Sequence, residues 1–250
     1  MKKLIAVIIV NLLTTVRIIG VICLLPVYLK YGGVAAACLS IGCYFTDLVD
    51  GVIARACHVS TFFGSAFDGV ADKMFSIANL IVLFKITKFA IFPILCELAI
   101  IVIQTIKYHK NENVQSSKVG KLKTWIIALT VISLYLLIDI TSVTVLPDSF
   151  IAYITGLNQI KMFAGVFAPL YIFEILTLLS YMKFLKHVHE PVKVDIPVVH
   201  IQLKPDTTLK NKIDNFCTLW FNYEFYEKYK DCAGLKQIKK SIKENNRNQG

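Results

Sequence analysis

Long apolar segments separated by short polar connections constrain the fold of this chain more than any other feature of its sequence. Each is close to the ~20 residues that a helix needs to cross a bilayer. They cover about residues 12–29, 34–55, 64–84, 89–106, 124–146 and 162–181. The mean hydropathy of +0.61 is also too high for an ordinary soluble domain. The sequence therefore predicts an all-α integral membrane protein, a six-transmembrane-helix bundle in which Gly32-Gly33 marks the first turn between spans.

Basic residues fall mainly on one side of this predicted bundle. With the N-terminus inside, the cytoplasmic side carries Lys2 and Lys3, the turn that follows Arg55, the loop over residues 107–123 and the C-terminal tail. Because cytoplasmic loops of membrane proteins are enriched in Lys and Arg, this bias predicts cytoplasmic N- and C-termini. It also accounts for the net charge of +10. Since the basic residues are not interleaved with aromatic ones, we expect no nucleic-acid partner.

The two ends of the chain depart from the six-span pattern. Residues 1–10 are an apolar run behind two lysines but lack a small-residue cleavage pattern, so we expect them to be retained at the membrane interface. From about residue 183 the composition becomes mixed, aromatic and basic. We therefore predict a membrane domain over residues 1–185 and a cytoplasmic tail of unknown role over residues 186–250. Aromatic and aliphatic residues of this tail could form one side of an amphipathic helix at the membrane surface, or equally a small packed appendage. They are Phe216, Leu219, Trp220, Tyr223 and Tyr226.

An acidic stretch interrupts the apolar sequence between Asp47 and Asp72, with the skeleton D-x2-D-G-x2-A-R-x8-G-x3-D-x3-D. Charge at membrane depth is costly and usually lines a site. On helices, Asp47 and Asp50 are about one turn apart, as are Asp68 and Asp72, so each pair shares a helix face. Residues 58–63 would form the turn between the two helices. The pattern predicts four carboxylates that converge at the cytoplasmic end of the second and third spans.

Four neighbouring carboxylates repel one another unless cations neutralise them. Oxygen ligands favour Mg²⁺ or Mn²⁺, and four carboxylates could hold two such ions about 3.5–4 Å apart. The alternative is a set of ion pairs within a helical core, but the stretch itself offers only Arg55 and Lys73 as partners. The Arg55 guanidinium could bind phosphate oxygens. The small residues Gly51, Ala54 and Gly64 leave room for a substrate against the backbone.

This acidic stretch resembles the signature of the CDP-alcohol phosphatidyltransferases, with every fixed position present. The resemblance covers about residues 11–182. It implies that Asp47, Asp50 and Asp68 are metal ligands. It also implies that Asp72 is a fourth ligand and the base that takes the proton of the attacking hydroxyl. The implied reaction is attack by an alcohol on the lipid-side phosphorus of a CDP-lipid, which expels CMP. The positions implied to hold the CDP-lipid are Gly51, Arg55 and Thr61.

A second segment extends the resemblance toward the N-terminus. Residues 11–17 resemble an N-x-L-T-x-x-R segment near the start of the family's first helix. Two interpretations of Arg17 follow. It contacts a phosphate at the mouth of the cavity, or its side chain extends along the membrane to reach the lipid headgroups.

A third segment, residues 120–124, resembles the G-K-x-K-T element of phosphatidylglycerophosphate synthases. Lys121 and Lys123 would then bind an acceptor phosphate. Ordinary positive charge in a cytoplasmic loop is the alternative. Glu97 falls where that subfamily has an Arg-Glu pair, although Cys96 replaces the Arg.

Taken with these segments, the resemblance implies transfer of a phosphatidyl group from CDP-diacylglycerol to glycerol 3-phosphate, in a polar cavity open to the cytoplasm. Other acceptors stay open: inositol phosphate, serine, a phospholipid, or a diacylglycerol that receives a phosphoamino alcohol. An inactive membrane scaffold or a transporter is disfavoured because the acidic signature is intact. Members of the family often form homodimers, so a second copy is an expected partner besides membrane lipid.

Overall fold

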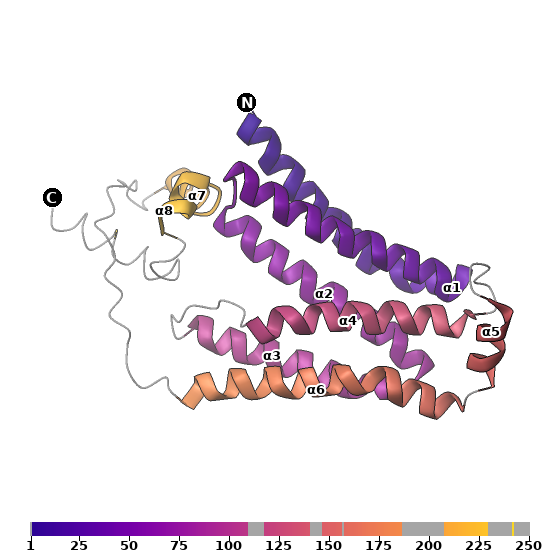
Figure 1. Ribbon diagram of the computed structural model, residues 1–250. Coiled ribbons are helices and arrows are strands. Elements are labelled where there is room, and N and C mark those ends of the chain that lie inside the picture. The colour runs from indigo at the N-terminus through magenta and orange to yellow at the C-terminus, as the bar shows by residue number, and fades with distance from the viewer. Residues whose placement is uncertain are drawn as a thin grey trace.

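The computed structural model describes residues 2–109, 118–140, 147–156, 158–186, 208–229 and 242. Every regular element in these residues is helical, which confirms the all-α prediction (Figure 1). A single 3₁₀ turn, Lys88–Ala90, joins two of the helices. The α-helices are α1 (Lys2–Cys57), α2 (Phe62–Ile86), α3 (Ile91–His109), α4 (Lys118–Ile138), α5 (Asp148–Thr155), α6 (Gln159–Lys186), α7 (Leu209–Trp220) and α8 (Tyr223–Tyr229).

Helix α1 is folded back on itself at Gly32. This residue has φ 83° and ψ −171°, a backbone conformation that glycine adopts without steric cost. The amide of Gly33 donates a hydrogen bond to the carboxylate of Asp139, which follows α4. The predicted turn at Gly32-Gly33 is thus confirmed. It divides α1 into a first arm, residues 2–31, and a second arm, residues 33–57, which lie side by side in Figure 1.

The long helices pack into one bundle around a shared apolar core. Helix α1 packs against α2 and α4, and α6 packs against α3 and α4. Buried side chains from α1, α2, α4 and α6 meet in the core, among them Leu24, Leu80, Leu134 and Phe167. A buried hydrogen bond from the Ser40 hydroxyl to the Asn79 side-chain oxygen, 2.9 Å long, joins the second arm of α1 to α2. These contacts determine how the acidic segments of α1 and α2 face each other.

The outer surface of the bundle is apolar. Large side chains such as Ile22, Leu29 and Leu129 are 63–70% exposed, as expected where helices face lipid. Among the described residues, three helices are long and apolar enough to cross a membrane: the α1 hairpin, α3 with its preceding turn, and α6. Helix α4 contains a shorter apolar segment, Leu122–Ile138. These features indicate an integral membrane protein, while the count of six spans stays a prediction.

Two sequence-based expectations differ from the structure. The fifth apolar segment was expected to continue to residue 146, but α4 ends at Ile138, next to Asp139, whose carboxylate binds the bend of α1. In the tail, the aromatic residues do not belong to one helix. Helix α7 ends at Trp220, and α8 begins at Tyr223 after a break in which the Asn222 side-chain oxygen accepts hydrogen bonds from the amides of Glu224 and Phe225.

Candidate active site

The turn between α1 and α2 places two acidic helix segments opposite each other. Helix α1 ends at Cys57, and α2 begins at Phe62 with Thr61 as its N-cap. The Thr61 hydroxyl accepts a hydrogen bond of 2.9 Å from the Gly64 amide, which stabilises the start of the helix. A side chain at Gly64 would press against that hydroxyl, because its Cβ would lie 3.0 Å away. Thr61 and Gly64 therefore have a structural role at the start of α2, independent of any contact with a substrate.

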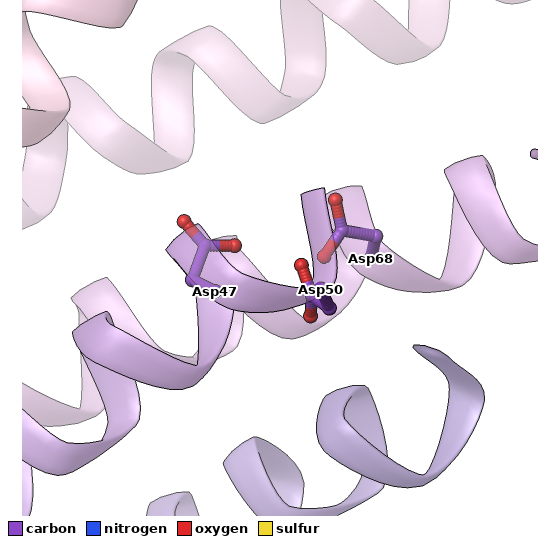
Figure 2. A group of neighbouring side chains, drawn as sticks. All are labelled: Asp47, Asp50 and Asp68. Carbon is purple, nitrogen blue, oxygen red and sulfur yellow. The ribbon is translucent and has the colours of Figure 1, made fainter. Parts of the chain in front are cut away.

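The carboxylates converge as the spacing predicts. One oxygen each from Asp47, Asp50 and Asp68 lies within 4.8 Å of the others (Figure 2). Asp50 is buried, whereas the side chains of Asp47, Asp68 and Asp72 are 31–41% exposed. The acidic cluster, defined as these four residues, is therefore held by the bundle on one side and accessible on the other.

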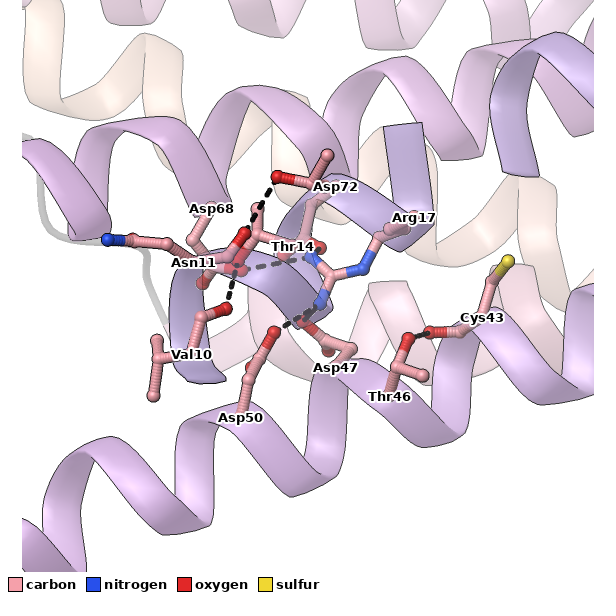
Figure 3. A network of polar contacts seen from close by, with 11 residues as sticks. Val10, Asn11, Thr14, Arg17, Cys43, Thr46, Asp47, Asp50, Asp68 and Asp72 are labelled. Carbon is pink, nitrogen blue, oxygen red and sulfur yellow. Dashed lines mark hydrogen bonds and ion pairs between the residues drawn. The ribbon is translucent and has the colours of Figure 1, made fainter. Parts of the chain in front are cut away.

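Arg17 from the first arm of α1 lies at the centre of the acidic cluster (Figure 3). Its Nη2 atom is 2.8 Å from Asp47 and 2.9 Å from Asp50, and its Nη1 atom is 2.9 Å from Asp68 and 2.5 Å from Asp72. The side chain is only 1% exposed. The expectation that Arg17 extends to the lipid headgroups is therefore wrong. A phosphate contact by Arg17 at the mouth of a cavity stays a prediction.

The donor set of the acidic cluster fits a divalent cation. It offers only carboxylate oxygens, which suit Mg²⁺ and Mn²⁺. One guanidinium against four carboxylates leaves a formal charge of −3, so further positive charge is favoured there. Asp47, Asp50 and Asp68 are placed to share one ion, and Asp72 is joined to them through Arg17.

The remaining residues of the acidic signature lie around this cluster. Arg55 is in the last turn of α1, exposed, and its guanidinium lies beside Gly51. A Cβ at Gly51 would be 3.4 Å from both terminal nitrogens of Arg55, so the glycine allows the arginine to lie along the helix. Ala54 is half-buried one position before Arg55. These positions put a cationic side chain at the open end of the helix pair.

A second polar cluster joins four helices deeper in the bundle. Lys123 of α4 is 2% exposed, and its ammonium lies 2.5 Å from Glu97 of α3 and 3.5 Å from Glu174 of α6. Lys73 of α2, the neighbour of Asp72 in the chain, lies 3.1 Å from the other oxygen of Glu97. We call these four residues the lysine–glutamate cluster. It begins next to the acidic cluster.

This arrangement changes the interpretation of the predicted lysine pair. Lys123 is buried and ion-paired, so the alternative of an ordinary charge in a cytoplasmic loop is wrong for this residue. The side chain of Lys121 lies outside what the structure describes. Glu174 was not singled out from the sequence, although a lone glutamate in an apolar helix is the kind of residue that marks a polar site in a membrane protein. Among the described residues, its Oε1 atom has no hydrogen-bond partner.

A cavity of about 510 Å³ lies at the opposite end of α2, lined by residues that include Thr87, Phe89, Phe163 and Tyr171. No acidic residue lines it. It is therefore separate from the acidic cluster, and the polar cavity expected beside that cluster stays a prediction.

Comparison with known proteins agrees with the geometry. The family model described as CDP-alcohol phosphatidyltransferase matches residues 7–181. The match includes the acidic cluster and the lysine–glutamate cluster, and it ends before α7 and α8. No curated protein and no solved structure matches the chain. Because the family model covers well over half of the 250 residues, the chain belongs to the CDP-alcohol phosphatidyltransferase family, whose members are transferases that move a substituted phosphate group from a CDP-alcohol to an acceptor.

Proposed function

We propose that this enzyme transfers a phosphatidyl group from CDP-diacylglycerol to glycerol 3-phosphate, giving phosphatidylglycerophosphate and CMP in phospholipid biosynthesis. The observation that carries the proposal is the convergence of Asp47, Asp50 and Asp68 within 4.8 Å at the ends of two helices. Such a site suits a diphosphate bridged by divalent cations. Two Mg²⁺ or Mn²⁺ ions held by the four aspartates would neutralise the diphosphate and stabilise the departing CMP.

The other residues of the signature have proposed roles on the donor side. Arg55 is exposed beside the cluster, where its guanidinium could bind a phosphate of the CDP-lipid. The small residues Gly51, Ala54 and Gly64 would leave room for the donor against the backbone. Gly51, Arg55 and Thr61 match the family's CDP-lipid positions.

Asp72 is the proposed base. In the reaction the acceptor hydroxyl attacks the lipid-side phosphorus, a new P–O bond forms, and the P–O bond to CMP breaks. The hydroxyl proton goes to a carboxylate oxygen of Asp72, whose side chain is 36% exposed and so is accessible to an acceptor. One Asp72 oxygen accepts a hydrogen bond of 2.5 Å from Arg17. Release of that contact would precede the role as base.

Glycerol 3-phosphate is the first candidate acceptor because a lysine follows Asp72 and is linked through Glu97 to a second lysine, Lys123. Lys73 follows Asp72 directly, and Lys123 matches a lysine of the phosphatidylglycerophosphate synthase element. One observation favours a second candidate. Glu97 and Glu174 make the lysine–glutamate cluster formally neutral, which suits an acceptor without a phosphate, such as serine or a diacylglycerol.

We further propose that the protein is a multi-pass membrane enzyme with the acidic cluster on the cytoplasmic side, where CMP can leave into solution. The distribution of Lys and Arg supports this orientation. A homodimer is expected by analogy with other family members.

Release of labelled CMP tests the proposal directly. Purified protein in mixed micelles with CDP-diacylglycerol is supplied with glycerol 3-phosphate, inositol phosphate or serine in turn. Diacylglycerol is tested separately, with a CDP-amino alcohol as the donor in place of CDP-diacylglycerol. We expect glycerol 3-phosphate to stimulate release most, and excess chelator to abolish it. Asp47→Asn serves as the inactive control. Stimulation by serine or diacylglycerol alone would select the second candidate. No release with any acceptor would contradict the enzymatic proposal.

A further inference from the structure

Helices α7 and α8 lie beyond the family match but are packed against the candidate active site. Phe62 and Phe63, in the first turn of α2, form the docking surface. The ring of Phe62 is 5.8 Å from that of Phe225 and 5.0 Å from that of Tyr226, and the ring of Phe63 is 4.6 Å from that of Phe221. Because Phe62 follows the N-cap Thr61, the tail is attached at the turn that positions the aspartates.

One face of α7 packs inward, and a different face is apolar and exposed. Leu219 is 2% exposed and belongs to the packed face. Leu209, Ile213 and Phe216 are 73%, 54% and 46% exposed. Their spacing of four and three residues places them on one side of the helix, and Trp220 continues the same line. These four residues are the apolar stripe of α7, of which Leu209, Ile213 and Phe216 are exposed and Trp220 is half-buried.

Basic residues lie on both sides of this stripe and a polar residue lies opposite it, an arrangement that is typical of helices that lie on membranes. At 3.6 residues per turn, Lys210 and Lys212 lie on opposite sides of the stripe, and both are exposed. Thr218 projects from the far side of the helix. Long basic side chains at the edges of an apolar stripe extend to lipid phosphates while the stripe is buried.

The position of α7 in the bundle matches this pattern. Figure 1 shows α7 nearly end-on, beside the start of α2, whereas the long helices run across the view. A helix that lies crosswise at the end of a bundle of membrane-spanning helices is parallel to the membrane surface.

We propose that α7 is an interfacial helix whose apolar stripe enters the headgroup region of an anionic leaflet on the side of the acidic cluster. Helices of this kind sit about 5–10 Å into the boundary between headgroups and acyl chains. Because Phe62 and Phe63 contact α8 and Phe221, which directly follows α7, an anchored α7 would keep the α1–α2 turn at the level where the diphosphate of a CDP-lipid lies. This inference goes beyond the proposed function and does not depend on the acceptor.

Trp220 provides the probe for a test on the full chain. The chain has two tryptophans, so Trp125→Phe leaves Trp220 as the only one. In nanodiscs that contain phosphatidylserine, we expect lipids with a quencher near the headgroup to quench Trp220 more than lipids with a quencher at the chain end. Ile213→Glu in this background should lose most of the shallow quenching. Thr218→Glu, which adds the same charge on the far side of α7, should retain it.

A second part of the experiment tests the role of the two lysines, and whether the stripe binds a second copy of the chain instead of lipid. Replacing Lys210 and Lys212 by Gln should weaken the dependence of the shallow quenching on phosphatidylserine. Each lysine near an anionic surface is expected to contribute about fivefold to partitioning. Absence of lipid quenching in the Trp125→Phe protein would overturn the proposal without reference to any variant. Loss of a dimer in Ile213→Glu with unchanged lipid quenching would likewise overturn it, and would assign the stripe to a second copy of the chain.

Discussion

Arg17 provides the positive charge that the acidic cluster contacts in the described structure. Its four contacts of 2.5–2.9 Å occupy carboxylate oxygens that divalent ions would also use. A guanidinium supplies one positive charge, whereas two divalent ions supply four. Metal binding is therefore expected to weaken the contacts of Arg17, and loss of Arg17 to make the fold depend on metal.

The variant Arg17→Met tests this relation. Removing one partner of a buried ion pair typically costs about 3–5 kcal/mol, because the remaining charge is left without compensation. We expect the variant to unfold at lower temperature than wild type in chelator, and Mg²⁺ to stabilise it more than it stabilises wild type. Thermal unfolding in detergent, with chelator and with Mg²⁺, measures both. Arg55→Met, which removes an exposed arginine from the same site, is the control. If Mg²⁺ raised the unfolding temperature of Arg17→Met and of wild type by the same amount, the idea that Arg17 and metal compete for the same carboxylates would be contradicted.

Replacement of Asp72 and replacement of the aspartates of α1 are expected to impair different steps, turnover in the first case and binding in the second. A positioned general base typically contributes about 10²–10⁴-fold to the rate. We expect Asp72→Asn to lose turnover by this factor while it retains CDP-lipid binding. Asp47→Asn and Asp50→Asn should weaken metal and CDP-lipid binding as well. Single-turnover CMP release and CDP-lipid binding, measured on the same three variants, separate the roles. Near wild-type turnover in Asp72→Asn would show that another group takes the proton.

The sequence predicts one half of this site much better than the other. The convergence of Asp47, Asp50 and Asp68 follows from spacing along two adjacent helices joined by a short turn. The position of Arg17 does not, because it depends on how the first arm of α1 is rotated against the second. That rotation is determined by packing between distant segments. Glu174 was missed for the same reason, since it meets Lys123 across 51 positions of the chain.

At the scale of elements, the lysine–glutamate cluster joins α2, α3, α4 and α6. Its central residue is Lys123, which pairs with carboxylates of two other helices. Replacement of this buried, doubly paired lysine leaves Glu174 without its ion pair and Glu97 with Lys73 alone, so the helices should separate more easily. The same residue is the proposed phosphate contact for the acceptor. A stability effect and an affinity effect are therefore both expected.

The variant Lys123→Gln measures both effects. We expect a loss of about 3–5 kcal/mol in the free energy of unfolding, together with a higher KM for glycerol 3-phosphate and an unchanged affinity for the CDP-lipid. Lys85→Gln, an exposed lysine near the end of α2, is the matched control for stability. If the KM for glycerol 3-phosphate stayed at the wild-type value despite the loss of stability, Lys123 would only join helices, and the acceptor would be bound elsewhere.

The helices themselves were largely predictable, because apolar length is a local property. The third, fourth and sixth expected spans correspond to α2, α3 and α6 with ends shifted by a few residues. The errors lie where local hydropathy carries little information. Helix α4 ends at Ile138, and the next residue, Asp139, accepts a hydrogen bond from the Gly33 amide at the bend of α1. The break between α7 and α8 depends on a side-chain cap at Asn222 rather than on hydrophobic pattern.

At the scale of the whole molecule, the polar chemistry is gathered toward one end of an otherwise apolar bundle. The α1–α2 turn, the acidic cluster and α7 lie at this end, and α5 lies at the other (Figure 1). In a membrane these two ends face different compartments. The proposed orientation therefore predicts that residues at the end with the acidic cluster are accessible from the cytoplasm. Residues at the end with α5 should be accessible from the opposite compartment.

Two single-cysteine variants of the chain test this orientation. Cys57 ends α1 beside the acidic cluster and is exposed. Tyr153→Cys places a thiol in α5, at a position 66% exposed at the opposite end. A charged maleimide that does not cross membranes is applied to sealed vesicles of each orientation. We expect it to label Cys57 only in inside-out vesicles, because the basic residues of this end hold it in the cytoplasm. The thiol in α5 should be labelled only in right-side-out vesicles. The reverse pattern would place the acidic cluster outside, and labelling of both thiols from one side would contradict a bundle that spans the membrane between them.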